Sequence, residues 1–249
     1  MTASVRAEWR KLRSTRALWS ALVGALTLTL VMLGMQLINA GKVGAPSLGT
    51  GMSARQIVTS PFLGTYAALL LGVVMSTSEF RYQTATPTFL TTPRRGQVVA
   101  AKVITAAAVG VLIGLCAAAA ALAVGLPWLA SHGVGLAVIG GELRVVALTM
   151  LVTYGFYAVI GVGVGALITN QAVAVAVPLV WFLVIETLVP SYGLGGLQPW
   201  LPAGATSALL LDPTVPGLLP PWAGALLIVA YGGGLALLGA RRIVRADIG

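Results

Sequence analysis

Residues that can do chemistry are few and scattered along this chain. Among 249 residues there are one histidine, His132, one cysteine, Cys116, and six acids. The acids are Glu8, Glu79, Glu142, Glu186, Asp212 and Asp247. An enzyme needs convergent reactive groups, and no H-E-x-x-H, C-x-x-C or G-x-S-x-G motif supplies them. We therefore expect neither a metal site nor an enzyme, and the lone cysteine cannot form an intrachain disulfide.

The chain also lacks the lysine motif that holds the phosphates of ATP. A P-loop ends in Gly-Lys followed by Ser or Thr. Of the three lysines, only Lys42 follows a glycine, and the next residue is Val43. The sequence therefore predicts no bound cofactor and no ATP hydrolysis by this route.

Glu186 is the one acid inside a long apolar run, which makes it the strongest candidate for an intramembrane functional residue. The alternative is a carboxylate at the end of a membrane span, where charge costs little, since the run ends near Val189. Pro178 removes one helical hydrogen bond in the same run and predicts a kink. Together with Tyr66, these two residues are the candidates for lining a translocation path.

Composition places the chain in lipid rather than in water. Hydrophobic residues make up 58% and charged residues 8%, with a mean hydropathy of +0.96, whereas soluble domains carry about 25% charged residues. A net charge of +9 would suggest nucleic acid in a soluble protein, but membrane proteins collect basic residues in cytoplasmic loops. The predicted fold is an all-α, polytopic membrane protein with one transmembrane domain over residues 1–249.

Six apolar runs are long enough to cross a bilayer, for which about 20 helical residues suffice. They cover residues 18–38, 57–77, 103–125, 145–168, 172–189 and 222–240. The fourth and fifth are separated only by Thr169–Gln171, which we interpret as a tight turn, because one helix through both would be far too long. Gly161, Gly163 and Gly165 predict close helix packing, with a substrate-facing role as the alternative.

Basic residues predict the orientation. With a cytoplasmic N-terminus, six spans place twelve of them inside and only Lys42, Arg55 and Arg144 outside. Because cytoplasmic loops retain basic residues, both termini are expected in the cytoplasm. Arginine outnumbers lysine 12 to 3 and alanine is abundant, which indicates a bacterial protein and hence the bacterial plasma membrane.

Residues 4–17 predict an amphipathic helix in the membrane interface. An apolar and a basic stripe recur at helical spacing on adjacent faces. The apolar stripe is Val5, Trp9 and Leu12, and the basic stripe is Arg6, Arg10 and Arg13. A cleaved signal peptide is the alternative, but the run at 18–38 is too long for one. At the other end of the chain, residues 190–221 are rich in proline yet apolar, which predicts short broken helices that re-enter the outer leaflet.

The polar interval 78–102, on the predicted cytoplasmic side, mixes apolar groups with fixed charges. The apolar groups are Phe80, Tyr82, Phe89 and Leu90, and the charges include Glu79, Arg81, Arg94 and Arg95. Such a mixture at a surface predicts a docking site for a partner protein. The alternative is an ordinary basic loop held by anionic lipid.

This interval resembles the first cytoplasmic loop of the type-2 (ABC-2-like) membrane permeases of bacterial ATP-binding-cassette exporters. The residues that carry the resemblance are Glu79, Arg81, Thr84, Leu90, Pro93, Arg94, Arg95 and Lys102. Residues 8–19 are similar to the interfacial helix that opens such permeases, and residues 201–210 to the stretch before their last span. Gln83 stands where the family usually has glycine, and Pro87 interrupts the family's short helix.

The resemblance implies a half-transporter. Two permease subunits, alike or different, would form the path, with residues 57–77 and 172–189 facing the dimer axis. Two separate ATPase subunits would bind ATP and Mg and dock at a short coupling helix within 78–102. The residues that the resemblance assigns to this docking are Glu79, Arg81, Thr84, Phe89, Leu90, Pro93, Arg94, Arg95 and Lys102. The exported substrate would be hydrophobic or amphipathic: a drug, lipid, glycolipid or peptide.

Other functions stay open on the sequence alone. An ion- or proton-coupled secondary transporter would need ionisable residues at mid-membrane and inverted repeats, and Glu186 is the one residue that points that way. A non-transporting regulatory membrane subunit is compatible with the same features. A membrane-embedded enzyme would need the acid/base or metal set that the chain lacks.

Overall fold

The computed structural model describes residues 2–40, 42, 51–81, 95–133, 141–212, 215 and 217–245. Within these ranges every regular element is a helix, and there is no strand. Six of the helical segments are long and apolar enough to cross a membrane. The predicted class, an all-α polytopic membrane protein, is confirmed.

The helices begin and end as follows. In the first half they are α1 (Thr2–Ser14), α2 (Arg16–Asn39), α3 (Gly51–Thr59), η1 (Ser60–Gly64), α4 (Thr65–Arg81) and α6 (Arg95–Ser131). In the second half they are α7 (Gly141–Leu167), α8 (Gln171–Val180), η3 (Trp181–Ile185), α9 (Glu186–Ser191), η4 (Gly195–Trp200), α10 (Pro202–Leu209) and α11 (Pro221–Arg245). The second span thus consists of α3, η1 and α4, and the fifth of α8, η3 and α9.

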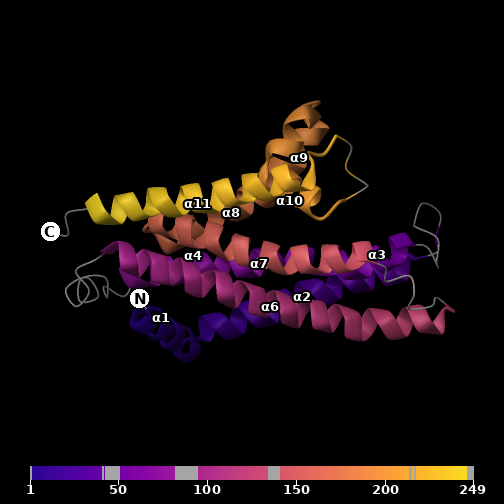
Figure 1. Ribbon diagram of the computed structural model, residues 1–249, viewed down its shortest axis with the longest axis horizontal. Helices are drawn as coiled ribbons and strands as arrows, with labels where there is room; N and C mark the ends of the chain where they lie inside the picture. Colours follow the sequence, from indigo (N-terminus) through magenta and orange to yellow (C-terminus); the bar gives the residue numbers. More distant parts are fainter. Residues whose placement is uncertain are drawn as a thin grey trace.

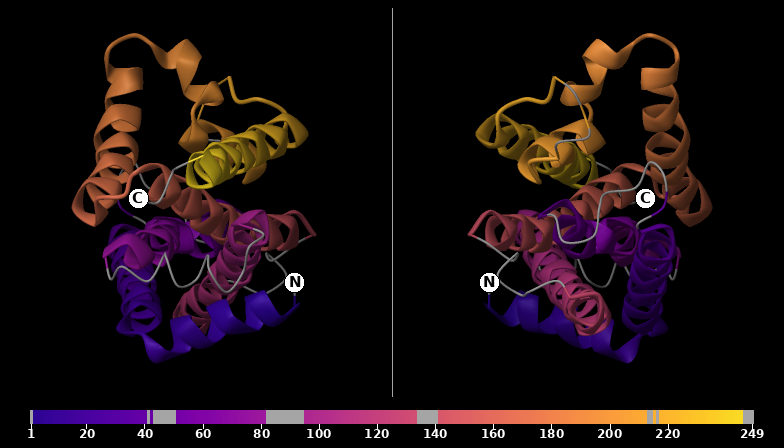
Figure 2. Two further views of the ribbon diagram at one scale, coloured as in Figure 1. Left: turned by 90° about the vertical axis from the view of Figure 1, so that its left-hand side faces the viewer. Right: turned by 90° about the vertical axis from the view of Figure 1, so that its right-hand side faces the viewer.

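The spans run roughly along the long axis of the molecule, except the fifth (α8, η3 and α9), which rises obliquely away from the others (Figure 1 and Figure 2). One end, called the terminal end below, holds α1, the end of α4, the start of α6 and the end of α11. The opposite, distal end holds α3. Helix α1 lies crosswise to the spans at the foot of the bundle (Figure 2). That orientation is the one expected of a helix in a membrane interface.

Helices α4 and α7 form the centre of the bundle because glycines let their backbones approach closely. A Cβ on Gly72 would lie 2.0 Å from the carbonyl oxygen of Ala158, and one on Gly161 would lie 2.0 Å from that of Leu69. The Ser76 hydroxyl donates to the Val162 carbonyl at 3.0 Å across the same contact. Small residues are the usual means of tight packing between membrane helices. The prediction of close packing at Gly161 is confirmed.

Burial separates this centre from the rest of the bundle. Within the chain, 72% of the most apolar window of the second span is buried, and 61% of that of the fourth. The corresponding share is 22% for the first, fifth and sixth spans and 33% for the third. The four peripheral spans therefore present most of their apolar surface outward, as lipid or a partner subunit requires.

The second span is not one straight helix, as the sequence suggested, but is interrupted by η1 at Ser60–Gly64. Pro61 at the start of η1 cannot donate a backbone hydrogen bond, which favours a break there. The buried Tyr154 hydroxyl donates to the Pro61 carbonyl at 2.7 Å. A neighbouring helix thus satisfies a backbone group at the break, which is how irregular backbone is tolerated inside membrane proteins.

Several boundaries differ from the sequence expectation. The third span, expected over 103–125, runs from Arg95 to Ser131, because Val98, Val99 and Ala101 are buried against the bundle and extend the helix. The N-terminal helix, expected over 4–17, ends at Ser14 before a short turn at Thr15. The interval 78–102 is largely helical at its flanks, while residues 82–94, and with them the expected coupling helix, lie outside the described residues.

Candidate functional site

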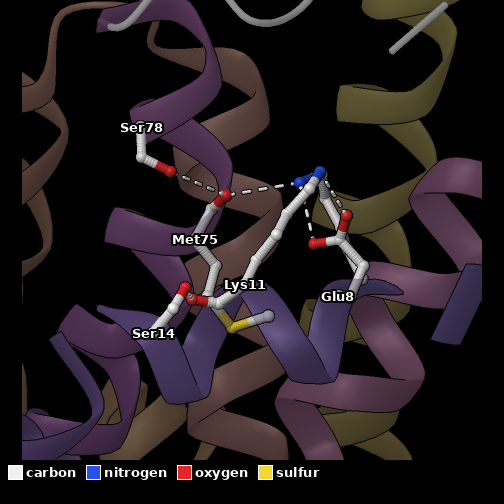
Figure 3. A network of polar contacts seen from close by, with 6 residues as sticks. Glu8, Lys11, Ser14, Met75 and Ser78 are labelled. Carbon is white, nitrogen blue, oxygen red and sulfur yellow. Dashed lines mark hydrogen bonds and ion pairs between the residues drawn. The ribbon is translucent and has the colours of Figure 1, made fainter. Parts of the chain in front are cut away.

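A buried cluster of charges joins three helices at the terminal end. Glu8 on α1 accepts from Lys11 Nζ at 2.9 Å through Oε1 and from Lys102 Nζ at 3.2 Å through Oε2. Lys102, near the start of α6, also donates to the Met75 carbonyl of α4 at 3.4 Å. The Ser78 hydroxyl donates to the same carbonyl (Figure 3). These residues, Glu8, Lys11, Met75, Ser78 and Lys102, are called the terminal cluster below.

The electrostatics of the terminal cluster follow from its burial. The side chains of Glu8 and Lys102 are 8% and 6% exposed, whereas that of Lys11 is 48% exposed. A buried charge is tolerated when an opposite charge and further hydrogen bonds compensate for lost hydration. Lys102 meets both conditions, and Lys11 reaches Glu8 from the water side. The pair therefore fixes α1 against the two helices that flank residues 82–94.

A second contact joins the end of α4 to the start of the fifth span. Arg81 Nη1 donates to Gln171 Oε1 at 2.8 Å on the exposed surface. The preceding residue, Asn170, caps α8, and its side chain accepts from the backbone N–H groups of Ala172 at 3.0 Å and Val173 at 3.2 Å. Asparagine is a preferred residue at such N-caps. The expected turn between the fourth and fifth spans is therefore tied to the segment that enters the 82–94 interval.

The terminal cluster borders a pocket of about 240 Å³. Its lining comes from α1, α2, α4, α6 and the start of α8, and includes Arg16, Ser78 and Gln171. Ala17 and Val74 also line a second pocket, the apolar groove, of about 490 Å³ between α2, α4 and the fifth span. Except for Ser20 and Tyr66, the groove is lined by apolar side chains and a glycine. A pocket at the terminal end that carries several charged and polar side chains thus adjoins an apolar groove that runs toward the distal end.

Tyr66, a candidate for the translocation path, lines the apolar groove and belongs to an aromatic cluster. Its ring centroid lies 6.1 Å from that of Tyr157 and 5.7 Å from that of Phe182. The Tyr157 and Phe182 rings lie 5.2 Å apart. Pro178, a second candidate, is buried in α8 one turn before the π-helical turn η3. The cluster therefore joins the second, fourth and fifth spans.

Glu186 is buried and holds a short helix in place. Its Oε1 accepts from Trp181 Nε1 at 2.8 Å, and its Oε2 accepts from the backbone N–H of Ala203 at 2.8 Å. The π-helical turn η3 brings side chains five positions apart onto one face, as its i→i+5 hydrogen bonding implies. Ala203 lies in the first turn of α10, where a carboxylate also meets the positive end of the helix dipole. The environment of Glu186 is therefore protein rather than open water.

Arg55, which the sequence analysis counted only as an outer basic residue, binds the other end of α10. Its Nη2 donates to the carbonyl oxygens of Leu210 and Leu211, at the C-terminus of that helix. Arg55 is buried, at 8% exposure. A cation at the carboxyl end and a carboxylate at the amino end both complement the helix dipole. We call this arrangement of Glu186, α10 and Arg55 the α10 clamp.

Of the residues predicted to couple to an ATPase, two are placed with their side chains. Arg81 binds Gln171 and Lys102 binds Glu8, as described above. Glu79 lies in the last turn of α4 and Arg95 begins α6, and their side chains are outside the described part of the chain. Outside it altogether lie Thr84, Phe89, Leu90, Pro93 and Arg94.

The N-terminal helix divides into the two faces that its spacing predicts. Leu12 is buried and Trp9 packs beside it on the main core, while Val5 is half-buried. Arg6, Arg10 and Arg13 are exposed. The sequence analysis missed that Glu8, between these faces, is buried with Lys102. The available signal was Lys102 itself, because a lysine within an apolar stretch requires an opposite charge nearby.

Comparison with known proteins finds a match over the part of the chain that contains this site. A family model described as "ABC-2 family transporter protein" matches residues 4–185. The matched residues include the terminal cluster, the apolar groove and the first five spans up to η3. No curated protein matches the chain. Among the described residues, no three His, Cys, Asp or Glu side chains are grouped so that they could hold a metal ion.

Proposed function

The chain belongs to the ABC-2 family of transporters, and on this basis we propose that it is the permease subunit of an ATP-binding-cassette exporter. Separate ATPase subunits, which bind ATP and Mg, drive it from the cytoplasm. The protein resides in the bacterial plasma membrane with both termini in the cytoplasm. It forms a path with a second permease subunit, identical or different.

The observation that carries the proposal is the linkage at the terminal end. The helices that enter and leave residues 82–94 are tied to α1 through Glu8 and Lys102, and to the fifth span through Arg81 and Gln171. A displacement of this interval by a docked ATPase would therefore reach α1 and the fifth span as well as α4 and α6. An ordinary basic loop held by lipid would need no such connections.

The substrate we propose is hydrophobic or amphipathic, such as a drug, lipid, glycolipid or peptide. In support, the apolar groove adjoins a pocket whose lining includes charged residues of the terminal cluster. A molecule with a polar head and an apolar body would match the two environments in order. Binding sites for small molecules are commonly concave, mostly apolar and furnished with a few polar groups.

In the dimer we propose that the fifth span faces the second subunit. It is 22% buried within its own chain, and Val177 and Val184 are among its exposed apolar residues. The second span was expected on the axis too, but it is 72% buried within the chain. It therefore reaches the path mainly where Leu63, Tyr66 and Leu70 line the groove.

An ion-coupled carrier is less well supported. Its coupling residue must bind and release an ion or proton during transport. Glu186, the one acid of the predicted spans, instead receives hydrogen bonds from Trp181 and Ala203. Two donors from neighbouring elements suit a structural carboxylate.

Purification from native membranes tests the proposal. The tagged chain, isolated in mild detergent, should bring with it a soluble-type subunit that carries a Walker A motif, and reconstituted vesicles should need ATP for export. Cysteine at Val184, in a Cys116→Ser background, should crosslink two permease subunits, whereas cysteine at Leu115 of α6, which is exposed to a similar degree, should not. Transport that proceeds in vesicles without ATP or an ATPase would overturn the assignment.

A further inference from the structure

A third pocket, separate from the groove and the terminal cluster, lies in the angle between α1 and α6. It has a volume of about 270 Å³ and is lined by Val5, Arg6, Trp9, Arg10, Ile104, Thr105 and Ala108. We propose that this pocket, called the α1–α6 pocket, binds one anionic phospholipid of the surrounding membrane. The proposal does not depend on the transported substrate.

The charge of the pocket selects an anion. Arg6 and Arg10 lie one helical turn apart on α1, and both are exposed. None of the seven described residues that line the pocket is acidic. Guanidinium groups bind phosphate oxygens through paired, charge-assisted hydrogen bonds. Two of them on one helix face can therefore hold the phosphodiester of a lipid.

A buried hydroxyl supports this independently. Thr105 is 2% exposed, and its Oγ1 has no hydrogen-bond partner among the described residues. A buried polar group without a partner is unfavourable and indicates a missing partner. Thr105 lines the pocket on the α6 side, opposite the arginines. The oxygen itself is closed off by protein atoms, so the side chain must rotate toward the pocket for a phosphate or ester oxygen of a bound lipid to supply the partner.

The remaining surface fits an acyl chain rather than a free phosphate ion. Ile104 is 45% exposed, and with Ala108, Val111 and Leu115 it forms an outward apolar stripe at helical spacing along α6. The eleven residue-to-residue steps of helix from Ile104 to Leu115 span about 16 Å at 1.5 Å each. Trp9, beside the arginines, is the side chain type that settles at the headgroup level. The arginines, Trp9 and the apolar stripe thus match the phosphate, the glycerol-ester region and the acyl chain of a phospholipid.

Native mass spectrometry of the delipidated full-length protein, titrated with phosphatidylglycerol, tests the site. Arg6→Gln with Arg10→Gln should weaken binding roughly 30-fold, since each basic residue near a membrane surface contributes about 1 kcal/mol. Arg241→Gln with Arg242→Gln removes the same charge from the exposed end of α11 and should leave binding unchanged. Equal loss in both double variants would show general attraction to charge and overturn the site.

Two further measurements separate the alternatives. Thr105→Val should weaken binding roughly fivefold, as expected for one hydrogen bond, without lowering the melting temperature of the lipid-free protein. A lower melting temperature with unchanged binding would make the hydroxyl structural and contradict its role. Glycerol 3-phosphate should not displace the lipid at matched concentration, and phosphatidylcholine should bind far more weakly. Displacement by the soluble phosphate, or equal binding of the neutral lipid, would overturn the proposal.

Discussion

Glu8 and Lys102 form a buried ion pair between segments 94 positions apart in the chain. Neither residue has an obvious role by itself, since one lies in a basic helix and the other at the start of an apolar run. Their pairing is what fixes α1 on the bundle beside the helices that flank residues 82–94. Removal of one member of a buried pair is far more costly than replacement of both by apolar groups.

Glu8→Gln should therefore destabilise the protein markedly, by about 3–5 kcal/mol if the pair behaves as buried pairs usually do. Lys102→Met should cost less, because Lys11 still neutralises Glu8 from the water side. The double variant Glu8→Leu with Lys102→Met should recover much of the loss. Thermal unfolding in detergent measures the three values. A Glu8→Gln protein that melts like wild type would show that the pair does not hold α1.

The α10 clamp is a device at the scale of one element. An eight-residue helix would be only marginally stable by itself, because its few backbone hydrogen bonds do not offset the entropy lost in forming the first turn. Charges from two different spans bind its two ends, Glu186 at the start and Arg55 at the end. The position of α10 is thus dependent on both the second and the fifth span.

Arg55→Met should loosen α10 without unfolding the bundle. Hydrogen bonds to charged groups contribute about 1.5–3 kcal/mol, so amide exchange in α10 should accelerate roughly tenfold or more. Hydrogen-exchange mass spectrometry should show this in peptides covering Pro202–Leu209, with α6 unchanged. Arg144→Met, which removes an exposed arginine at the same end, is the matched control. Equal exchange in the two variants would refute the clamp.

The close contact between α4 and α7 leads to a second prediction at the scale of single helices. Gly161→Ala places a methyl group against the Leu69 backbone, which cannot move without separating the helices. Gly34→Ala adds the same group to α2 where nothing lies within 4 Å. Fluorescence-detected size exclusion should show a strong loss of folded protein for the first variant and none for the second. Normal folding of Gly161→Ala would mean that the helices are less closely packed than described.

For the whole molecule, six spans return the chain to the end where it began. The prediction is that both termini are cytoplasmic, because the basic residues collect on that side. In a Cys116→Ser background, cysteines at Ser14 and Ile248 should resist an impermeant thiol reagent in intact cells, and a cysteine at Gly49 should react. Labelling at Ile248 from outside would refute the even number of spans.

Much of the architecture could be predicted from the sequence, because the length of an apolar run is a local property set by the lipid solvent. The turn at Asn170 and the packing role of Gly161 were also predictable from residue type. The break at Pro61, the pairing of Glu8 with Lys102 and the binding of Arg55 to α10 were not. Each of these features depends on which helices, distant in the sequence, pack against each other. Local composition and spacing do not determine that arrangement.

The central claim is that residues 78–102 couple ATP hydrolysis to transport. The direct measurement is ATPase stimulation by the permease in reconstituted vesicles, for wild type, Arg94→Glu with Arg95→Glu, and Arg241→Glu with Arg242→Glu. Like charges placed against a partner surface weaken docking strongly. We predict that the first double variant inserts normally but loses most of the stimulation, while the second retains it. Full stimulation by the Arg94→Glu, Arg95→Glu protein would contradict the account.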